Sequence, residues 1–142
     1  MFDRPSYRIF DMKENKFFEP TYKGYKGEIE DLSICPHGDL LLRTIDNNTH
    51  ESVFPNRYMV DMFTGRTDTK DAYIHVRDIV VINGGPNDGR VGAVYFDSEK
   101  LAYVVKGSFL FNRMELHEGY TFTIIGNCHQ NQDLLLGGET NV

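Results

Sequence analysis

Short runs of apolar residues that alternate with polar ones recur along the chain, and glycine, asparagine, aspartate or proline bounds each run. This alternation predicts β-strands, because successive side chains of a strand point to opposite faces of its sheet. In the second half of the chain it predicts strands at residues 79–82, 91–96, 101–105, 109–111 and 121–125. The first half is less regular and predicts strands at residues 7–11, 40–45 and 58–63.

The intervening segments carry signals of their own. Residues 83–89, NGGPNDG, are predicted to form a loop, and residues 97–100, DSEK, a hairpin turn. Residues 29–34 are predicted to form one or two helical turns, and residues 21–27, which are rich in Gly, Lys and Tyr, an exposed loop.

Gly92 lies inside one predicted strand, where a residue without a side chain lets the strand coil sharply, as small barrels require. We therefore predict a mainly β fold with a short helical segment. A small SH3-like barrel is expected in the C-terminal half, at about residues 58–136, with additional N-terminal strands packed on it.

Length and composition fit this fold. A chain of 142 residues can bury a core without disulfides, and 40% hydrophobic with 25% charged residues excludes long disordered regions. Its 10 Phe, 8 Tyr and 13 Gly favour strands joined by tight turns. Because no linker or internal repeat is visible, residues 1–142 are predicted to form a single domain.

Charge and cysteine content bear on partners and compartment. The net charge is −6, which counts against nucleic acid as the main partner, although a local basic patch would still be compatible with it. The sequence shows no signal peptide and no apolar stretch long enough to span a membrane. Cys35 and Cys128 do not form a secreted disulfide framework, so we expect reduced thiols in a cytoplasm.

The candidate metal ligands are Cys35 and His37, together with Cys128 and His129. Structural zinc sites usually separate paired cysteines by two to four residues, a spacing that is missing here. Side chains as close in sequence as Cys128 and His129 would point to opposite faces of a strand. Whether the two pairs approach each other is open, but packed thiols and surface imidazoles are the better interpretation, and no cofactor is predicted.

Nucleophilic catalysis would need a cysteine or serine beside a histidine and an orienting acid. No such nucleophile lies in a strand-to-helix elbow. Glu28, Glu30 and Asp31 are typical of a solvated face, and so are Asp68 and Asp71. A small hydrolase assembled from distant positions stays an alternative. The sequence favours a protein that is not an enzyme, and no catalytic residue is assigned.

Two segments are candidates for contact with a partner. The first interleaves aromatic rings with ammonium groups, as single-strand binders do, and consists of Tyr22, Lys23, Tyr25 and Lys26. A protein-binding loop or a purely structural loop would have the same sequence. The second is Arg90, at the end of the glycine-rich loop 84–90, where it could touch a phosphate. No Lys-Ser/Thr pair completes a phosphate-binding loop there.

The segment FTGRTDTKDAYIHVRDIV, residues 63–80, resembles the YopX-like family of phage and prophage proteins. The matching positions are Phe63, Thr64 and Gly65 at its start and Asp78, Ile79 and Val80 at its end. Residues 7–18, YRIFDMKENKFF, are similar to the opening strand of that family. Residues 122–135, FTIIGNCHQNQDLL, are similar to its closing segment and contain Gly126 and Asn127. Residues 20–56 carry no family motif.

The resemblance has departures: Arg77 replaces the usual Gly before the Asp, Lys70-Asp71 replaces an Asn-Gly turn, and Phe10 replaces a Trp. The matched residues also have a plain structural interpretation. Gly65 and Gly126 are each expected at the end of a strand with positive φ, and Asp78 is expected to accept a hydrogen bond from a turn N–H. The expected core residues are Ile79, Val80, Ile124 and Ile125. A catalytic Asp78 is the weaker alternative.

The resemblance implies a phage accessory protein with a β-rich fold and no established biochemical activity. Since the sequence offers no site for chemistry, we expect it to bind a macromolecule in the cytoplasm of a bacterial host. The expected partner is a host or phage protein, or another copy of the chain through an exposed strand. A nucleic-acid-associated protein of phage replication or regulation is the alternative.

Overall fold

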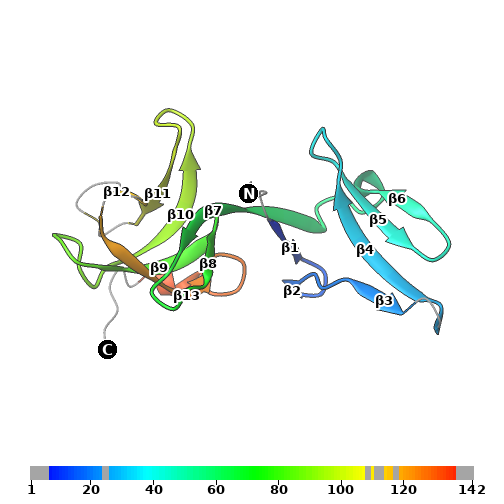
Figure 1. Ribbon diagram of the computed structural model, residues 1–142, viewed down its shortest axis with the longest axis horizontal. Coiled ribbons are helices and arrows are strands. Elements are labelled where there is room, and N and C mark those ends of the chain that lie inside the picture. Colours follow the sequence, from blue (N-terminus) through cyan, green and yellow to red (C-terminus); the bar gives the residue numbers. More distant parts are fainter. Residues whose placement is uncertain (1–6, 24–25, 108–109, 111–113, 117–118, 137–142) are drawn as a thin grey trace. The chain divides into compact units, whose positions relative to one another are not determined.

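The computed structural model describes residues 7–23, 26–107, 110, 114–116 and 119–136 (Figure 1). The fold is mainly β, as predicted, and it contains a short helical segment, although not where the sequence predicts one. The chain divides into two compact units: unit 1 combines residues 1–8 and 61–142, and unit 2 comprises residues 9–60. That both units fold as a single domain stays a prediction.

Unit 1 contains a five-stranded antiparallel sheet with the hydrogen-bonded order β12-β11-β10-β9-β13. The elements are β9 (Asp78–Asn83), β10 (Val91–Asp97), β11 (Ala102–Lys106), β12 (Met114–Glu115), β13 (Thr121–Asn127) and the helix α1 (Asp133–Leu136). Four consecutive strands form a meander, and β13 returns to pair with β9. This order is compatible with the predicted SH3-like barrel, whose closure and packing against N-terminal strands stay predictions.

Both faces of this sheet carry buried apolar side chains. Along β9, Val80 and Ile82 belong to one core cluster and Ile79 to another, because alternate residues face opposite sides. The first cluster continues with Ile74, Val94, Val105, Met114, Leu116 and Phe122, and the second with Val91, Ala93 and Cys128. Leu134 and Leu135 of α1 pack on the second. Burial on both faces explains the uninterrupted apolar run 79–82.

Gly92 is required by a close approach between strands. A Cβ atom at this position would lie 2.5 Å from Cγ1 of Val105 and 3.0 Å from the carbonyl oxygen of Lys106. Any side chain here would push β10 away from its neighbour.

Two further strands pass from one unit into the other: β1 (Tyr7–Asp11) and β7 (Tyr58–Thr67). Within unit 1, β7 pairs with β8 (Tyr73–His75), and within unit 2, β1 pairs with β2 (Lys16–Phe17). The sheet of unit 2 has the order β3-β4-β5-β6. Its strands are β3 (Thr21–Lys23), β4 (Glu28–Ile34), β5 (Leu40–Thr44) and β6 (Asn48–His50), followed by the 3₁₀ turn η2 (Glu51–Val53).

Unit 2 corrects two predictions. Residues 29–34 are not helical but form most of β4, in which Leu32 pairs with Leu42 and Ile34 with Leu40. Leu32 and Ile34 thus lie on the same face of the sheet as the buried Leu40 and Leu42, and this pairing selects strand over helix for the segment. Residues 21–23, predicted as loop, form the edge strand β3, in which Tyr22 pairs with Ile29.

In unit 1, one strand boundary and two burial predictions differ from the structure. Asp68, predicted on a solvated face, is buried and accepts backbone N–H groups of its own turn. The hairpin turn reaches Leu101, whose φ of 51° ends the extended backbone, so β11 begins at Ala102. Ile125, predicted as core, is 37% exposed, whereas Ile124 packs against the first cluster. The predicted strand at 109–111 falls mostly on residues outside those described.

Candidate macromolecular interface

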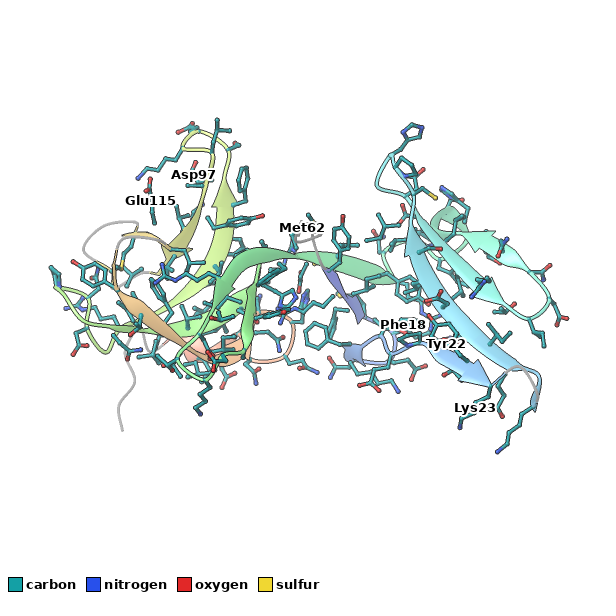
Figure 2. The ribbon with its side chains drawn as sticks, in the orientation of Figure 1. Phe18, Tyr22, Lys23, Met62, Asp97 and Glu115 are labelled. Atoms are coloured by element: carbon teal, nitrogen blue, oxygen red, sulfur yellow. The ribbon has the colours of Figure 1, made fainter. Side chains whose placement is uncertain are left out.

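The predicted aromatic and basic segment does not form one surface. Tyr22 and Lys23 are exposed neighbours on β3 (Figure 2). They therefore point to opposite faces of the sheet, so the ring and the ammonium group cannot meet the same partner face. Lys26 is exposed in the following turn, and Tyr25 lies outside the described residues.

Tyr22 belongs to a polar chain on one face of the unit 2 sheet. A hydrogen bond to Asp31 raises the pKa of the Tyr22 hydroxyl, and Asp31 in turn lies 3.8 Å from Arg43. The ring is 62% exposed, so it remains accessible to a partner. On the other face, Lys23 stands opposite Glu28 in the register of β3 and β4. Tyr22, and not the predicted tetrad, is the candidate contact in this unit.

Arg90 closes the glycine-rich loop through its backbone. Its N–H donates to the carbonyl of Asn87 at 3.0 Å, and its carbonyl accepts from the N–H of Ile82 at 2.9 Å. At the start of the loop, the N–H of Gly84 donates to the Asp88 carboxylate at 2.6 Å. A negative group thus already occupies one backbone N–H of this loop, and a contact between Arg90 and a phosphate stays a prediction.

The residues that carry the family resemblance are structural. The ring of Phe63 stacks on Tyr73 with centroids 4.3 Å apart, and the hydroxyl of Thr64 donates to the carbonyl of Ile74 at 2.8 Å. Gly65 has a φ of 89°, as predicted, but it does not end a strand: it lies inside β7, at an irregular pairing with β8. The following Arg66 donates to the carbonyls of Leu116 and Tyr120, so this segment is tied to the far end of unit 1.

Asp78 stabilises the turn before β9 by accepting a backbone hydrogen bond, as the sequence predicts. One carboxylate oxygen accepts the N–H of His75 at 2.7 Å, and the other accepts Nη1 of Arg8 at 2.6 Å. Burial is the main reason that its pKa is raised, against the opposing effect of these hydrogen bonds. Arg77, which replaces the family glycine, adopts a φ of 70°, so the turn keeps the backbone that glycine would supply.

A buried carboxylate that the sequence analysis missed lies beside this turn. Asp61 on β7 is fully buried and accepts from Nε of Arg8 at 3.0 Å, Nη1 of Arg77 at 2.8 Å and Nε2 of His129 at 2.8 Å. Its partners come from positions far apart in the sequence, which no local pattern reveals. The available signal is its place inside the otherwise apolar run YMVDMF at residues 58–63.

This ionic cluster is built to hold segments together. Both oxygens of Asp61 accept from guanidinium or imidazole donors. His129 presents Nε2–H to Asp61, since the carboxylate can only accept. The cluster thus ties the strand of Arg8, the turn of Arg77 and the segment after β13 to one point in unit 1.

The cysteine and histidine candidates are divided between the units. Cys35 and His37 belong to unit 2, and Cys128 and His129 to unit 1. Burial raises the pKa of the Cys128 thiol, whose sulfur lies 3.7 Å from the hydroxyl of Tyr95. A buried protonated thiol is a weak nucleophile. Within the described part of the chain, no three His, Cys, Asp or Glu side chains cluster as metal ligands would.

Gly126 and Asn127 shape the turn after β13. The carboxamide oxygen of Asn127 accepts the N–H groups of His129 and Gln130, each at 3.0 Å. The expected positive φ at Gly126 is wrong. A Cβ atom on Gly126 would instead lie 2.7 Å from Oδ1 of Asn131, which receives the N–H of Asn127 at 3.1 Å. Glycine is needed here because a side chain crosses its backbone.

Exposed apolar side chains gather at the end of the β10–β11 hairpin in unit 1. Phe96 is 49% exposed and Leu101 80% exposed. The ring of Phe96 meets that of Tyr103 edge to face, with centroids 5.2 Å apart. These side chains form the second candidate contact surface, alongside Tyr22 in unit 2.

Comparison with known proteins decides the family. The sequence matches the YopX protein family over residues 6–136, which includes most of both units. This chain belongs to the YopX family. The resemblance seen in the FTG and DIV motifs is thereby confirmed.

Solved structures share the YopX fold of this chain. Protein yopX from Bacillus subtilis is 20% identical with a TM-score of 0.59, over 91% of this chain and 96% of that one. Protein EF1440 from Enterococcus faecalis is 18% identical with a TM-score of 0.55, over 93% and 98% of the two chains. At these identities the likeness shows the fold alone. No curated protein matches the chain.

Proposed function

We propose that this member of the YopX family is a phage or prophage accessory protein that acts by binding another macromolecule in the bacterial cytoplasm. The proposal includes that it is not an enzyme and that its partner is a host or phage protein or a second copy of itself. Family membership supports the phage context, which the YopX-like resemblance implies.

The observation that carries the proposal is the contrast between interior and surface. The buried carboxylates Asp61 and Asp78 are already paired with guanidinium and N–H donors, so their oxygens are engaged in contacts within unit 1. Aromatic and aliphatic side chains, by contrast, stand exposed on Tyr22, Phe96 and Leu101. Exposed aromatic residues are enriched at protein interfaces. In the described residues, no helix is long and apolar enough to cross a membrane.

Affinity capture with a tagged chain from infected or lysogenic bacteria tests this function. We expect a specific macromolecule to co-purify with the wild type, and less of it with Tyr22→Ala or Phe96→Lys. Lys100→Ala, a change at a polar position of the same hairpin, is the matched control. Capture of the same material by every variant, or of none by the wild type, would contradict binding through these surfaces.

Nucleic acid is the second candidate, favoured by the exposed ring of Tyr22 on one face of the unit 2 sheet and by the exposed Lys23 on its other face and Lys26 in the following turn. Base stacking on an exposed tyrosine and counterion release by lysines would give salt-dependent binding. Fluorescence anisotropy with single-stranded DNA and RNA oligonucleotides measures it. Binding at low salt that disappears in the Lys23→Ala/Lys26→Ala double variant would favour this candidate, and no binding at low salt would remove it.

A further inference from the structure

Two segments of unit 2 border an open hollow. One is the turn between β1 and β2, and the other is the stretch that leads from η2 into β7. The N–H of Met12 donates to the carbonyl of Arg57 at 2.7 Å and so ties the two segments together. The hollow has a volume of about 440 Å³, which is large enough for a small ligand or an anchoring side chain. The residues that line it are Met12, Lys13, Phe54, Pro55, Asn56 and Arg57.

The guanidinium group of Arg57 is held in one orientation. Its Nε donates to one carboxylate oxygen of Asp11 at 3.1 Å, and its Nη2 donates to the other at 2.9 Å. The same group lies 5.6 Å from the centre of the Phe54 ring and 4.9 Å from that of Tyr58. A planar guanidinium that is already fixed loses little conformational entropy when it binds a ligand.

Arg57 keeps one nitrogen atom for a further contact. Among the described residues, Nη1 has no hydrogen-bond partner, and the side chain is 19% exposed. The ammonium group of Lys13 and the carboxamide of Asn56 belong to exposed residues of the same lining. All three groups can donate hydrogen bonds to a carboxylate, and the two charged ones make the stronger bonds.

The charge of the lining is positive. In the described part of the chain, the charged residues that line the hollow are both cations, Lys13 and Arg57. Two carboxylates lie nearby. Asp11 already accepts from Arg57 and from the N–H groups of Lys13 and Glu14, whereas Glu14 acts on the charge of Arg57 through space and does not line the hollow. The hollow thus favours an anionic group, although the chain as a whole has a net charge of −6.

The rest of the lining is apolar. Met12 is 50% exposed, Phe54 is half-buried and Pro55 is exposed. An apolar side chain that enters the hollow removes these surfaces from water, and the flexible thioether of Met12 can adapt to its shape. The site therefore combines an apolar contact with donors for a carboxylate.

The geometry points to an acidic partner. We propose that this hollow binds an acidic segment of another protein, in which an apolar side chain stands next to a carboxylate. The apolar side chain contacts Met12, Phe54 and Pro55, and the carboxylate accepts from Arg57 and Lys13. This inference rests on the proposed binding function and names the chemistry of the partner. A nucleic acid fits less well, because two cations neutralise few phosphates and the apolar lining has no counterpart in a phosphate backbone.

Two matched small molecules test the recognition chemistry. N-acetyl-phenylalanine carries an aromatic ring beside a free carboxylate, and its carboxamide has the same ring without the charge. Each is titrated into the isotope-labelled full chain, and the amide chemical shifts are followed by NMR. We expect shifts concentrated at residues 12–13 and 54–57, with a dissociation constant about 5-fold higher for the carboxamide. No localised shifts with N-acetyl-phenylalanine, or equal affinity for both molecules, would overturn the proposal.

Substitutions at exposed positions separate the two parts of the site. Lys13→Glu is expected to weaken binding of N-acetyl-phenylalanine about 5-fold and to leave the carboxamide unaffected, whereas Met12→Ser is expected to weaken both. Lys16→Glu, on β2 and outside the lining, is the matched control and is expected to bind as the wild type does. The dispersion of the amide shifts checks that each variant folds. Equal losses in Lys13→Glu and Lys16→Glu would reduce the effect to overall charge and contradict the site.

Failure of this site and failure of the proposed function give different results. If neither small molecule binds while the wild type still captures a cellular partner through Tyr22 or Phe96, the binding function stands and the hollow is not its site. A single-stranded oligonucleotide is the last comparison. If it displaces N-acetyl-phenylalanine and binds Met12→Ser as tightly as the wild type, the hollow is a polyanion site and the acidic protein segment is excluded.

Discussion

Both units of this chain place aspartates beside arginines, but at different depths. In unit 1, Asp61 is fully buried and joins Arg8, Arg77 and His129. In unit 2, Asp31 lies on the exposed face of the sheet, 3.8 Å from Arg43. The Asp11–Arg57 pair of unit 2 is intermediate, with a nearly buried carboxylate and a guanidinium that is 19% exposed.

This difference in depth indicates which ion pairs contribute most to the stability of the fold. A buried carboxylate must be fully satisfied, because water cannot replace a lost partner, whereas an exposed pair exchanges its partner for water at little cost. The same logic separates the apolar residues. Unit 1 buries both faces of its five-stranded sheet, whereas in the four-stranded sheet of unit 2 only Leu40 and Leu42 are buried. Unit 1 is therefore expected to be the more sensitive to substitution.

The largest effect is expected from Asp61→Ala. It leaves two guanidinium groups and an imidazole without their shared acceptor, and breaking a buried pair costs about 3–5 kcal/mol. Because Arg8 and Arg77 are partly exposed, the lower end of this range is expected. Native-state hydrogen exchange of the β9 and β13 amides measures the loss in unit 1. Unchanged protection there would show that the cluster contributes no stability.

Asp11→Asn is expected to cost less, about 2 kcal/mol, because it weakens a charge-assisted pair whose arginine can reach water. Asp11 accepts Nε of Arg57 at 3.1 Å and Nη2 at 2.9 Å, and it also accepts the N–H of Lys13 at 3.0 Å. The β4 and β5 amides report on unit 2. If Asp11→Asn destabilised this unit more than Asp61→Ala destabilises unit 1, depth would not be the deciding variable.

How far the sequence predicts this structure follows from the same contrast. Local alternation gives most strands, since the pairing of Val94 with Val105 buries residues that the pattern marks as apolar. It fails at residues 29–34, where only pairing with β5 selects strand over helix. It also cannot find Asp61, whose partners are distant in the chain and meet it only after folding. The cluster is a tertiary property.

The contact residues predicted from the sequence do not share one surface, and the reason is local. Sequence proximity suggested that Tyr22 and Lys23 act together, but neighbouring residues of a strand face opposite ways. The prediction treated residues 21–27 as a loop and so lost this constraint. Phe96 lay inside a correctly predicted strand, yet its exposure depends on where β9 ends, which the pattern does not specify.

The pH dependence of stability is expected to have opposite signs at two carboxylates. In unit 2, hydrogen bonds from Arg57 lower the pKa of Asp11 below 3.8, so its contribution is present above pH ~4 and is lost as the pH falls through the folded pKa. In unit 1, burial raises the pKa of Asp78 above 3.8. Its contribution is therefore fully present below that value and is lost as the pH rises through the folded pKa.

Urea unfolding of the wild type, Asp11→Asn and Asp78→Asn separates these cases. The free energy of unfolding of each protein is measured between pH 3 and 6, at intervals of about 1 pH unit. The stability difference between wild type and Asp11→Asn should grow with pH, and the difference between wild type and Asp78→Asn should shrink. Two differences that rise together would show that burial does not dominate at Asp78.

The smallest effect is expected from Arg43→Ala on the exposed face of unit 2. An exposed pair at 3.8 Å contributes about 0–1 kcal/mol, so the change in stability should fall below ~0.5 kcal/mol. The informative measurement is the titration of Tyr22, followed by its absorbance at alkaline pH. Asp31 raises the pKa of that hydroxyl and Arg43 opposes it, so removing Arg43 should raise the pKa further. A lower pKa of Tyr22 in this variant would mean that Arg43 acts mainly by orienting Asp31. The exposed contacts among these three side chains would then depend on geometry, as the buried cluster of unit 1 does.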